Sequence, residues 1–426
     1  MDCKLSVIRC SRSLVQPCEQ TPCATLHLSP IDSLPALRCN ARTLHVFKDA
    51  PHEAAPAAVI RQALSRALAP YYPLAGRLDQ QAYPLQLDCS NQGQGVLFVE
   101  ASSSNTLASL NYLDDLTSIP YDLLLPELES EALVQMQVTQ FACGGFVMGL
   151  IFCHSICDGL GAAQFLNAVG ELARGVDPAP TITPKWHRDF FPKPLNAINP
   201  QIPPPVMPDY SLQHSNIDIP IDRINRLKKQ FQESTGGSCS AFEIVAACFW
   251  RSRTRAVYEK SNNSEEVKLV FFANCRELVE PPLPKGFYGN CFFPVTISRC
   301  CRGIGEASIN EVVKLIQEAK SRVGREMGEY MRRRQMEEGR DSDPFAPPLN
   351  YSTLFISEWG RLGFNQVDYG WGPPVHVVPI QGSAVIPVGI VGFLPLPRKG
   401  IRLMTWCVQE PHRPSFLHHI SQLFLL

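Results

Sequence analysis

The chain has 426 residues, which is too long for one ordinary domain, so we expect two domains of roughly 200 residues each. Its 39 basic and 40 acidic side chains leave a formal charge of −1, which gives no electrostatic reason to expect nucleic acid or an anionic membrane as a partner. The 16 cysteines are scattered without a C-x-x-C pair, which favours reduced thiols in a cytoplasmic protein. Basic residues interrupt the apolar N-terminus, so neither a signal peptide nor a membrane span is predicted.

The first half of the chain, residues 1–175, mixes helical and extended patterns. Apolar residues at helical spacing predict two helices, over residues 59–68 and 161–174. Alternating and then continuous apolar residues, joined by a Gly-Gly turn, predict a hairpin of two strands over residues 133–141 and 146–152. We therefore expect an N-terminal domain in which a sheet packs against helices.

A proline-rich stretch, residues 176–209, separates the two halves. It holds ten of the 37 prolines, including Pro203, Pro204 and Pro205, and proline continues neither a helix nor a central strand. We interpret this stretch as a long crossover loop between two domains.

The second half, residues 210–426, is predicted to be a C-terminal domain of the same mixed kind. Helices are expected over residues 221–233 and 414–426, and a third from Ser240, which forms a capping box with Glu243. Five strands are expected, over residues 267–273, 292–297, 376–379, 384–391 and 402–408. The charged stretch 332–343 is expected to be a mobile surface loop. The whole pattern predicts an α/β fold of two similar-sized domains, each a mixed sheet with flanking helices.

His154 and Asp158 stand between a buried strand and a helix, where rigid elements hold side chains beside a cleft. An imidazole has the unperturbed pKa that suits proton abstraction near neutral pH, so His154 is a candidate general base. A purely structural histidine is the competing interpretation. Metal ligation by the pair is disfavoured because no third ligand lies nearby, and the absence of a G-x-S-x-G sequence disfavours a catalytic triad.

Two further groups of residues stand out. The sequence Asp368-Tyr-Gly-Trp-Gly372 places an acid before two glycines that flank a tryptophan, which on physical grounds indicates a structural turn. Arg276 follows a predicted strand and precedes the segment 286–290, and an arginine at a strand end can bind a buried carboxylate through two hydrogen bonds.

Together these segments resemble the BAHD superfamily of plant acyl-CoA-dependent acyltransferases. The resemblance spans almost the whole chain, and it is carried by Leu28-Ser29 with Asp32, residues 72–78 (YPLAGRL), H-x-x-x-D-G at 154–159, Gln164-Phe165, Ser240 to Glu243, Gly289-Asn290 and D-x-G-W-G at 368–372. Residues 143–175 look closest to the branch that includes taxane O-acetyl and O-benzoyl transferases and benzyl-alcohol acyltransferases. This likeness implies a neutral, hydrophobic alcohol and a short or aromatic acyl group.

The resemblance implies a fold similar to chloramphenicol acetyltransferase, with a channel between the two domains. Acyl-CoA and the alcohol would enter this channel from opposite sides. His154, midway along it, would take the proton of the alcohol, which would then attack the thioester and release CoA. Trp371 would donate a hydrogen bond to the oxyanion.

Other residues take supporting roles by the same resemblance. Asp158 would point away from the substrate and pair with Arg276. Structural support of the site is expected from Asp158, Arg276, Asp368, Gly370, Gly372 and Asn290. Contacts to the pantetheine arm of acyl-CoA are expected from Ser240, Ala241 and Ser357.

The sequence departs from the family pattern at two positions. Tyr369 stands where most relatives have Phe, and it adds a hydroxyl that needs a partner. Pro373 replaces a residue that is often basic in relatives and can lie near the acceptor, so no acceptor contact is carried over to that position.

The expected activity is therefore O-acylation of a hydrophobic alcohol of plant specialised metabolism. We expect a cytoplasmic monomer that uses acyl-CoA as cosubstrate, with no permanently bound cofactor, no metal, and no nucleic-acid or membrane partner. One alternative is an N-acyltransferase that uses the same base on an amine. A second is a non-enzymatic homologue that binds a small molecule, which the intact His154, Asp158 and Arg276 disfavour because a pure binder has no use for a free base.

Overall fold

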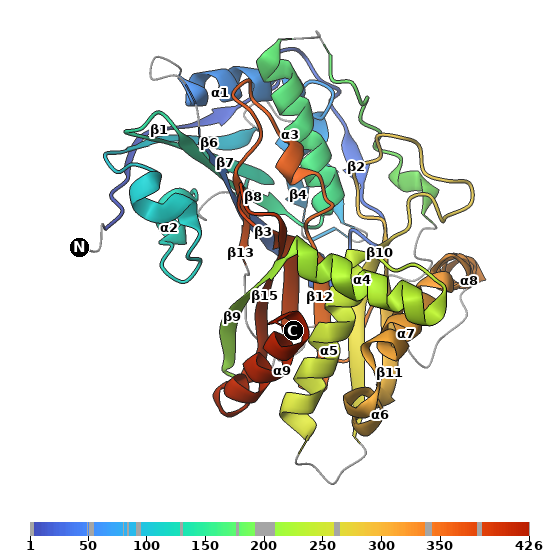
Figure 1. Ribbon diagram of the computed structural model, residues 1–426. Helices are drawn as coiled ribbons and strands as arrows, with labels where there is room; N and C mark the ends of the chain where they lie inside the picture. The colour runs from blue at the N-terminus through green and yellow to red at the C-terminus, as the bar shows by residue number, and fades with distance from the viewer. Residues whose placement is uncertain are drawn as a thin grey trace.

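The structure is a computed structural model that describes residues 4–48, 50, 55–79, 81–82, 85–90, 95–127, 131–175, 179–191, 209–259, 265–336, 343–380 and 386–425. It has two lobes, each built on a six-stranded mixed sheet with helices packed against it (Figure 1). The α/β fold of two mixed-sheet domains predicted from the sequence is confirmed.

The first sheet has the strand order β1-β6-β7-β8-β3-β13. Its strands are β1 (Ile8–Val15), β6 (Val96–Ser103), β7 (Val134–Phe141), β8 (Phe146–Cys153), β3 (Asn40–Phe47) and β13 (His376–Ile380). Neighbouring strands run antiparallel, except for the parallel pair β6 and β7. The β7–β8 hairpin is the one that the sequence predicts, and Gly144 has the positive φ of 89° that suits its turn.

Two helices, α1 (Pro56–Ala67) and α3 (Gly159–Arg174), pack against each other over this sheet (Figure 1). Alternate residues of β8, from Phe146 to Phe152, join these helices in one hydrophobic cluster, as expected for a strand with one face toward helices. A small sheet of β2 (Thr25–His27), β5 (Gln86–Asp88) and β4 (Arg77–Asp79) and the short helix α2 (Tyr121–Leu124) complete the lobe.

The second sheet has the strand order β11-β10-β12-β14-β15-β9. Its strands are β11 (Phe292–Cys300), β10 (Glu266–Asn274), β12 (Thr353–Glu358), β14 (Val388–Phe393), β15 (Gly400–Gln409) and β9 (Leu212–Pro220). Its helices are α4 (Ile221–Thr235), α5 (Ala241–Tyr258), α6 (Cys301–Glu306), α7 (Ile309–Ser321), α8 (Val323–Met336) and α9 (Arg413–Leu425). The central helix α5 is buried over most of its length, which explains why its first half, up to Trp250, is apolar except for Glu243.

The charged stretch 332–343 is only partly described, and the loop prediction is wrong for its beginning. Residues 332–336 form the last part of α8, while residues 337–342 lie outside the described residues. Helix propensity explains the difference, since arginine, glutamine and methionine are good helix formers and the stretch continues an amphipathic helix.

The crossover is described over residues 179–191, and Pro203, Pro204 and Pro205 lie outside the described residues. This part runs between the lobes, where Lys185 forms an isolated parallel bridge with Phe287 of the second half. A single 3-10 turn at Arg188–Phe190 follows. Residues 384–385, at the start of the predicted strand 384–391, also lie outside the described residues.

The two lobes exchange structure at their junction. β13 comes from the second half of the chain but pairs with β3 of the first sheet, from His376 opposite Val46 to Ile380 opposite Arg42. One hydrophobic cluster also joins residues of β3 to Ile390 and Met404 of the second sheet. The domain boundaries at 175 and 210 therefore stay a prediction about the chain, while the folded lobes share a strand and a core.

In the described part of the chain, no helix has both the length and the apolar character needed to cross a membrane.

Candidate active site

His154 lies on the turn between β8 and α3, and its backbone is held at both ends. Its N–H donates to the carbonyl of Cys39 at 2.8 Å, and its carbonyl accepts from Asn290 Nδ2 at 2.8 Å. The side chain is half-buried, and its Nδ1 atom is buried without a hydrogen-bond partner among the described residues. Of the two ring nitrogens, Nδ1 is therefore closed to solvent.

Asp158 is the N-cap of α3, a role that the sequence periodicity did not predict because it placed the helix start at residue 161. Its Oδ1 atom accepts from the Gly161 N–H at 2.9 Å and from Arg276 Nη2 at 2.8 Å. Its Oδ2 atom accepts from the Cys291 N–H at 3.3 Å. Burial alone would raise the pKa of Asp158, but the charge and hydrogen bonds of Arg276 hold this pKa below its ordinary value.

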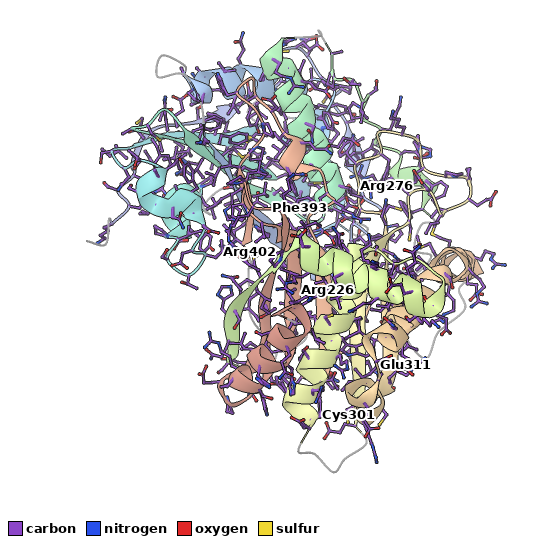
Figure 2. The ribbon with its side chains drawn as sticks, in the orientation of Figure 1. Arg226, Arg276, Cys301, Glu311, Phe393 and Arg402 are labelled. Atoms are coloured by element: carbon purple, nitrogen blue, oxygen red, sulfur yellow. The ribbon has the colours of Figure 1, made fainter. Side chains whose placement is uncertain are left out.

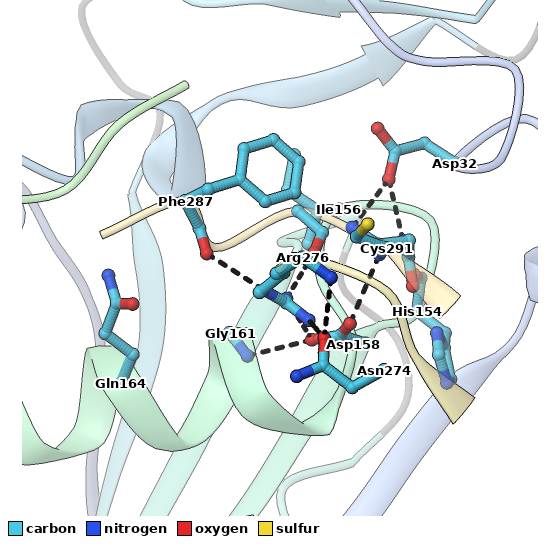
Figure 3. Close-up of polar contacts among 12 residues, drawn as sticks. Asp32, His154, Ile156, Asp158, Gly161, Gln164, Asn274, Arg276, Phe287 and Cys291 are labelled. Atoms are coloured by element: carbon cyan, nitrogen blue, oxygen red, sulfur yellow. Dashed lines mark hydrogen bonds and ion pairs between the residues drawn. The ribbon is translucent and has the colours of Figure 1, made fainter. Parts of the chain in front are cut away.

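Arg276 reaches Asp158 from the second lobe, after β10. Its guanidinium also donates to the carbonyls of Gly289 at 2.7 Å and Phe287 at 3.3 Å, so the ion pair ties the α3 N-terminus to the chain before β11. Figure 3 shows the dashed contacts of Asp158 converging on Arg276, Gly161 and Cys291, while the ring of His154 carries none. The contact between Asp158 and Arg276 is thus present as expected, and both carboxylate oxygens of Asp158 are engaged by groups other than His154.

Asp368 organises the turn that the two glycines form. Its Oδ1 atom accepts from the N–H groups of Gly370 at 2.8 Å and Gly372 at 2.9 Å. Both glycines have φ values, 111° and 86°, that other residues rarely adopt, which explains the D-x-G-x-G pattern. The carbonyl of Asp368 accepts from Arg174 near the end of α3. These contacts are those of a structural turn.

The structure does not bring Trp371 to His154. The ring of Trp371 lies edge-on to Phe146, with the two centroids 5.8 Å apart. Phe146 begins β8 and His154 follows its end, so the two are separated by about 26 Å at the usual rise of a strand. Trp371 therefore lies far beyond hydrogen-bond reach of a reaction at His154, and the expected oxyanion role is not carried further.

The two departures from the family pattern lie close to Trp371. Tyr369 is buried beside Phe47, and its hydroxyl has no hydrogen-bond partner among the described residues, while burial raises its pKa above the ordinary value. Pro373 is exposed. Neither side chain is close to the turn that carries His154.

The three residues expected to contact pantetheine lie in the second lobe, Ser240 and Ala241 at the start of α5 and Ser357 on β12. Ser240 caps α5 in the predicted capping box, in which its Oγ accepts from the Glu243 N–H at 3.2 Å and its own N–H donates to Glu243 Oε2 at 2.9 Å. Ser357 accepts at Oγ from Trp359 Nε1 at 3.1 Å. Ala241 lines a cavity.

That cavity has a volume of about 500 Å³ and opens where the lobes meet. Its walls come from β13, from β14 and β15, from the N-terminal ends of α4 and α5, and from residues 358–365. Figure 2 places Phe393, one of its lining residues, at the junction of the lobes. His154 is not among the lining residues, so this cavity is not itself the whole of the expected channel.

The cavity carries both charge and apolar surface. Glu358 is a wall residue whose Oε1 accepts from the Gly360 N–H at 2.8 Å, and burial raises the pKa of this carboxyl to about 6. Arg361 and Lys399 are exposed cations of the same cavity. Phe393 and Leu396 are 48% and 55% exposed, which makes an apolar rim.

Comparison with known proteins decides the family. Residues 5–391 match the model of the family described as the Transferase family. The chain is 39% identical to acyl transferase 4 of Oryza sativa subsp. japonica, with 98% of each chain covered. It belongs to the BAHD superfamily of acyltransferases.

Two taxane enzymes are also similar to this BAHD chain. The 3'-N-debenzoyl-2'-deoxytaxol N-benzoyltransferase of Taxus canadensis is 35% identical over 95% of this chain and 93% of its own. The taxadien-5-alpha-ol O-acetyltransferase of Taxus cuspidata is 33% identical over 88% and 86%. The likeness to the taxane branch is therefore confirmed, and it covers both N- and O-acylation.

Solved structures agree on the BAHD fold. Vinorine synthase matches with a TM-score of 0.76 at 21% identity, with 98% of each chain covered. TRI101 of F. sporotrichioides, solved with coenzyme A and T-2, matches with a TM-score of 0.67 at 12% identity over 92% of this chain and 97% of its own. At these identities the likeness shows the fold alone.

One buried residue beside the His154 turn was not predicted from the sequence. Arg188 of the crossover is 3% exposed and binds both Asp32 and the carbonyl of Ile156. The crossover has neither helical nor strand periodicity, so nothing local indicated that one of its arginines would be buried. The signal available was Asp32, an acid in a motif that the resemblance used, which required a buried donor.

Proposed function

We propose that this chain is an acyl-CoA-dependent O-acyltransferase that esterifies a hydrophobic alcohol, with His154 as the general base and with release of free CoA. The observation that carries the proposal is the His154 turn, in which the backbone is fixed by Cys39 and Asn290 and the buried Nδ1 atom leaves Nε2 as the accessible nitrogen. A base held by two rigid elements is preorganised for proton abstraction.

The reaction then follows from the chemistry of the base. Nε2 of neutral His154 accepts the hydroxyl proton of the alcohol as its oxygen attacks the thioester carbonyl. The tetrahedral intermediate collapses with cleavage of the carbon–sulfur bond. The imidazolium returns its proton to the departing thiolate, so that the products are an ester and CoA thiol, and the base is regenerated.

The cavity at the lobe junction supports the substrate classes. Its apolar rim at Phe393 and Leu396 would receive an apolar acceptor or acyl group, because burying such surface is favourable. Arg361 and Lys399 on the same cavity would meet the phosphates of an acyl-CoA. Ala241 in its wall would contact the pantetheine arm, as would Ser240 and Ser357, which precede the wall residues Ala241 and Glu358 in the chain.

An amine acceptor is the second candidate. The similarity to an N-benzoyltransferase of Taxus canadensis favours it, since the same base would serve an amine. A panel of matched alcohols and amines, assayed by thiol release with acetyl-CoA and benzoyl-CoA, separates the two. Faster turnover of every amine than of its matched alcohol would replace the O-acyl proposal.

The role of His154 is tested by His154→Ala. We expect thiol release with the preferred alcohol to fall by about 10²–10⁴-fold, the usual contribution of a general base, while circular dichroism shows a folded protein. His27→Ala is the matched control, because His27 is an exposed histidine on β2 of the same lobe. Activity of more than about a tenth of wild type in His154→Ala would remove the base role.

A further inference from the structure

Asp32 forms a second buried ion pair beside the His154 turn. Its carboxylate is fully buried, and Oδ2 accepts from Arg188 Nε at 3.2 Å and from the Ser29 N–H at 3.0 Å. Oδ1 accepts from both the N–H and Nδ2 of Asn290, at 3.1 and 2.7 Å. One carboxylate thus joins the N-terminal segment, the crossover and the chain that leads into β11.

The partners of Asp32 also hold the backbone of the turn. Arg188 Nη2 donates to the Ile156 carbonyl at 2.5 Å, and Asn290 Nδ2 donates to the His154 carbonyl at 2.8 Å. The guanidinium of Arg188 also lies over the Trp186 ring, with Cζ 3.8 Å from the ring centroid, a favourable cation–π contact. Asp32 therefore binds both side chains that donate to these two carbonyls, and Arg188 is also held by the carbonyl of Trp186, which its Nη1 reaches at 3.1 Å.

Two ion pairs thus act on different parts of the turn. Asp158 with Arg276 fixes the start of α3, and Asp32 with Arg188 and Asn290 fixes the carbonyls of residues 154 and 156. Figure 3 shows Asp32 near the backbone of His154, while Asp158 lies with Arg276 on the helix side. In the described part of the chain, the side-chain hydrogen bonds of Asp158 and Arg276 beyond the pair itself go to Gly161, Cys291, Phe287, Gly289 and Asn274 and not to the carbonyls of residues 154 and 156, so the first pair does not duplicate the contacts of the second.

We propose that Asp32 and Arg188 are positioning residues for the acyl transfer, which orient the His154 imidazole by holding the carbonyls of residues 154 and 156. The inference rests on the proposed base role of His154. It also gives the crossover a part in catalysis, since Arg188 is its contribution to the site. Misplacement of a reacting group by about 1 Å can lower a rate about 10²-fold, so a small shift of this turn has a measurable effect.

The main test is Arg188→Lys, which keeps the charge but replaces the planar fork by a single point donor. A lysine cannot bind Asp32 and the Ile156 carbonyl in the same way, so the turn loses one of its two supports. We expect kcat per folded molecule to fall about 10- to 100-fold, with KM for acyl-CoA within about twofold of wild type. Asp32→Asn is expected to act in the same direction.

Arg253→Lys is the matched control. Arg253 is fully buried, donates through Nε to the carbonyl of Cys407 at 2.8 Å and lies 4.9 Å from the Tyr351 ring centroid, in the second lobe. It imitates Arg188 in burial, carbonyl contacts and aromatic neighbour, but it has no contact with the turn. The control is expected to lower the midpoint of denaturant unfolding, with kcat per folded molecule unchanged.

Asn290→Ala provides a second variant in case Arg188→Lys does not accumulate as folded protein. It removes the donor to the His154 carbonyl and leaves the Asp32–Arg188 pair, and it should lower kcat with little change in KM. If Arg188→Lys or, failing that, Asn290→Ala loses stability as Arg253→Lys does but keeps the wild-type kcat, the positioning role is overturned.

The proposed function and the positioning role are contradicted by different results. Activity that survives in His154→Ala contradicts the proposed function itself. An inactive His154→Ala beside fully active Arg188→Lys and Asn290→Ala contradicts only the positioning role. Loss of kcat in all three, with the Arg253→Lys control active, is the result that we expect.

Discussion

At the scale of single residues, the ion pair of Asp158 and Arg276 connects the two lobes at the N-terminus of α3. Both side chains are largely buried, at 12% and 14% exposure. Such pairs gain little net stability over apolar residues, but the loss of one partner leaves a buried charge uncompensated. The pair is therefore a sensitive probe of how the site is assembled.

We predict that Asp158→Asn and Arg276→Met each lower the free energy of unfolding by about 3–5 kcal/mol, and that the double variant loses less than their sum. The reason is that the second substitution removes the charge that the first left unpaired. A double-mutant cycle with denaturant unfolding measures the coupling. Simple addition of the two losses would mean that the residues do not interact in solution.

A different prediction concerns the pH dependence of stability, and it rests on His45. It is fully buried on β3, with Nε2 2.8 Å from Thr43 Oγ1, and burial lowers its pKa to about 3. The folded protein thus leaves His45 neutral at pH values where the unfolded chain takes up a proton, below about 6.5. Because the unfolded state binds more protons there, stability must decrease as the pH falls from about 6.5 toward 3.

We predict that His45→Phe makes the free energy of unfolding less dependent on pH, by about 1.4 kcal/mol per pH unit between pH 6 and 4.5. The ring keeps its edge contact with Phe364, so the comparison isolates the proton. His27→Gln, at an exposed position, should leave the slope unchanged. An equal slope in His45→Phe and wild type would show that His45 is protonated in the folded protein.

Residues near the turn differ in how far the sequence could predict them. His154 and Asp158 lie on a strand–turn–helix segment whose periodicity is local, and the Asp158–Arg276 contact followed from the family resemblance. Arg188 could not be found in this way, because its partners are distant in sequence and its own segment has no period. The expected place of Trp371 near His154 could not be checked from the sequence for a related reason. Its position depends on packing against Phe146, at the far end of β8 from His154.

At the scale of elements, α3 is placed by two glycines that allow close approach. A Cβ on Gly161 would lie 1.9 Å from the Tyr288 carbonyl oxygen, and one on Gly170 would lie 2.6 Å from that of Asp368. The helix therefore touches the backbone of two segments from the second half of the chain, near its start and in its later turns. Its position, and with it the direction of the His154 turn, depends on these contacts.

We predict that Gly161→Ala lowers the free energy of unfolding by about 1–3 kcal/mol, because α3 must shift away from Tyr288. The same shift should lower kcat. Gly328→Ala in α8 is the control, since a Cβ there meets no atom within 4 Å. In a helix interior that change should instead stabilise by about 0.5–1 kcal/mol. Thermal unfolding and initial rates measure both effects, and a neutral Gly161→Ala would contradict the close contact.

The elements most clearly predicted were those with one strong period. The β7–β8 hairpin, α3, α4 and α5 were each expected within a few residues of their bounds. α8 was missed because its charged last turn resembles a solvated loop when its packing is unknown. β13 was expected as a strand, but its sheet could not be assigned, since only the folded chain shows that it pairs with β3.

At the scale of the whole molecule, the lobes are held together by a polar network as well as by the shared core. Arg402 of β15 makes two hydrogen bonds to Asp218 of β9, both at 2.7 Å. The same guanidinium reaches the first lobe at Asp114, with 2.8 Å between Nη2 and Oδ1. Arg398, which lines the cavity, binds both acids too, at 2.6 Å to Asp114 and 2.9 Å to Asp218.

The two acids of this network have different structural roles, and a substitution of each acid can test its role. Asp218 joins two strands of one sheet, whereas Asp114 joins that sheet to the other lobe beside the cavity. Burial would raise the pKa of Asp218, but the hydrogen bonds and charges of Arg402 and Arg398 lower it. Asp218 therefore contributes stability above its unfolded pKa, and this contribution is lost as the pH falls through the lower folded pKa.

We predict that Asp114→Asn changes the global free energy of unfolding by less than about 1 kcal/mol, because Asp114 is partly exposed and Arg402 keeps its bidentate partner. It should nevertheless speed amide hydrogen exchange at residues 108–113 and raise KM, since the lobes then hold the cavity less firmly. Asp218→Asn should show the reverse pattern. We expect a larger loss in the free energy of unfolding, about 1–3 kcal/mol, and little change in amide exchange at residues 108–113. Equal stability losses, with uniform exchange in both variants, would show that the lobes open only together and that the link through Asp114 has no local effect on the cavity.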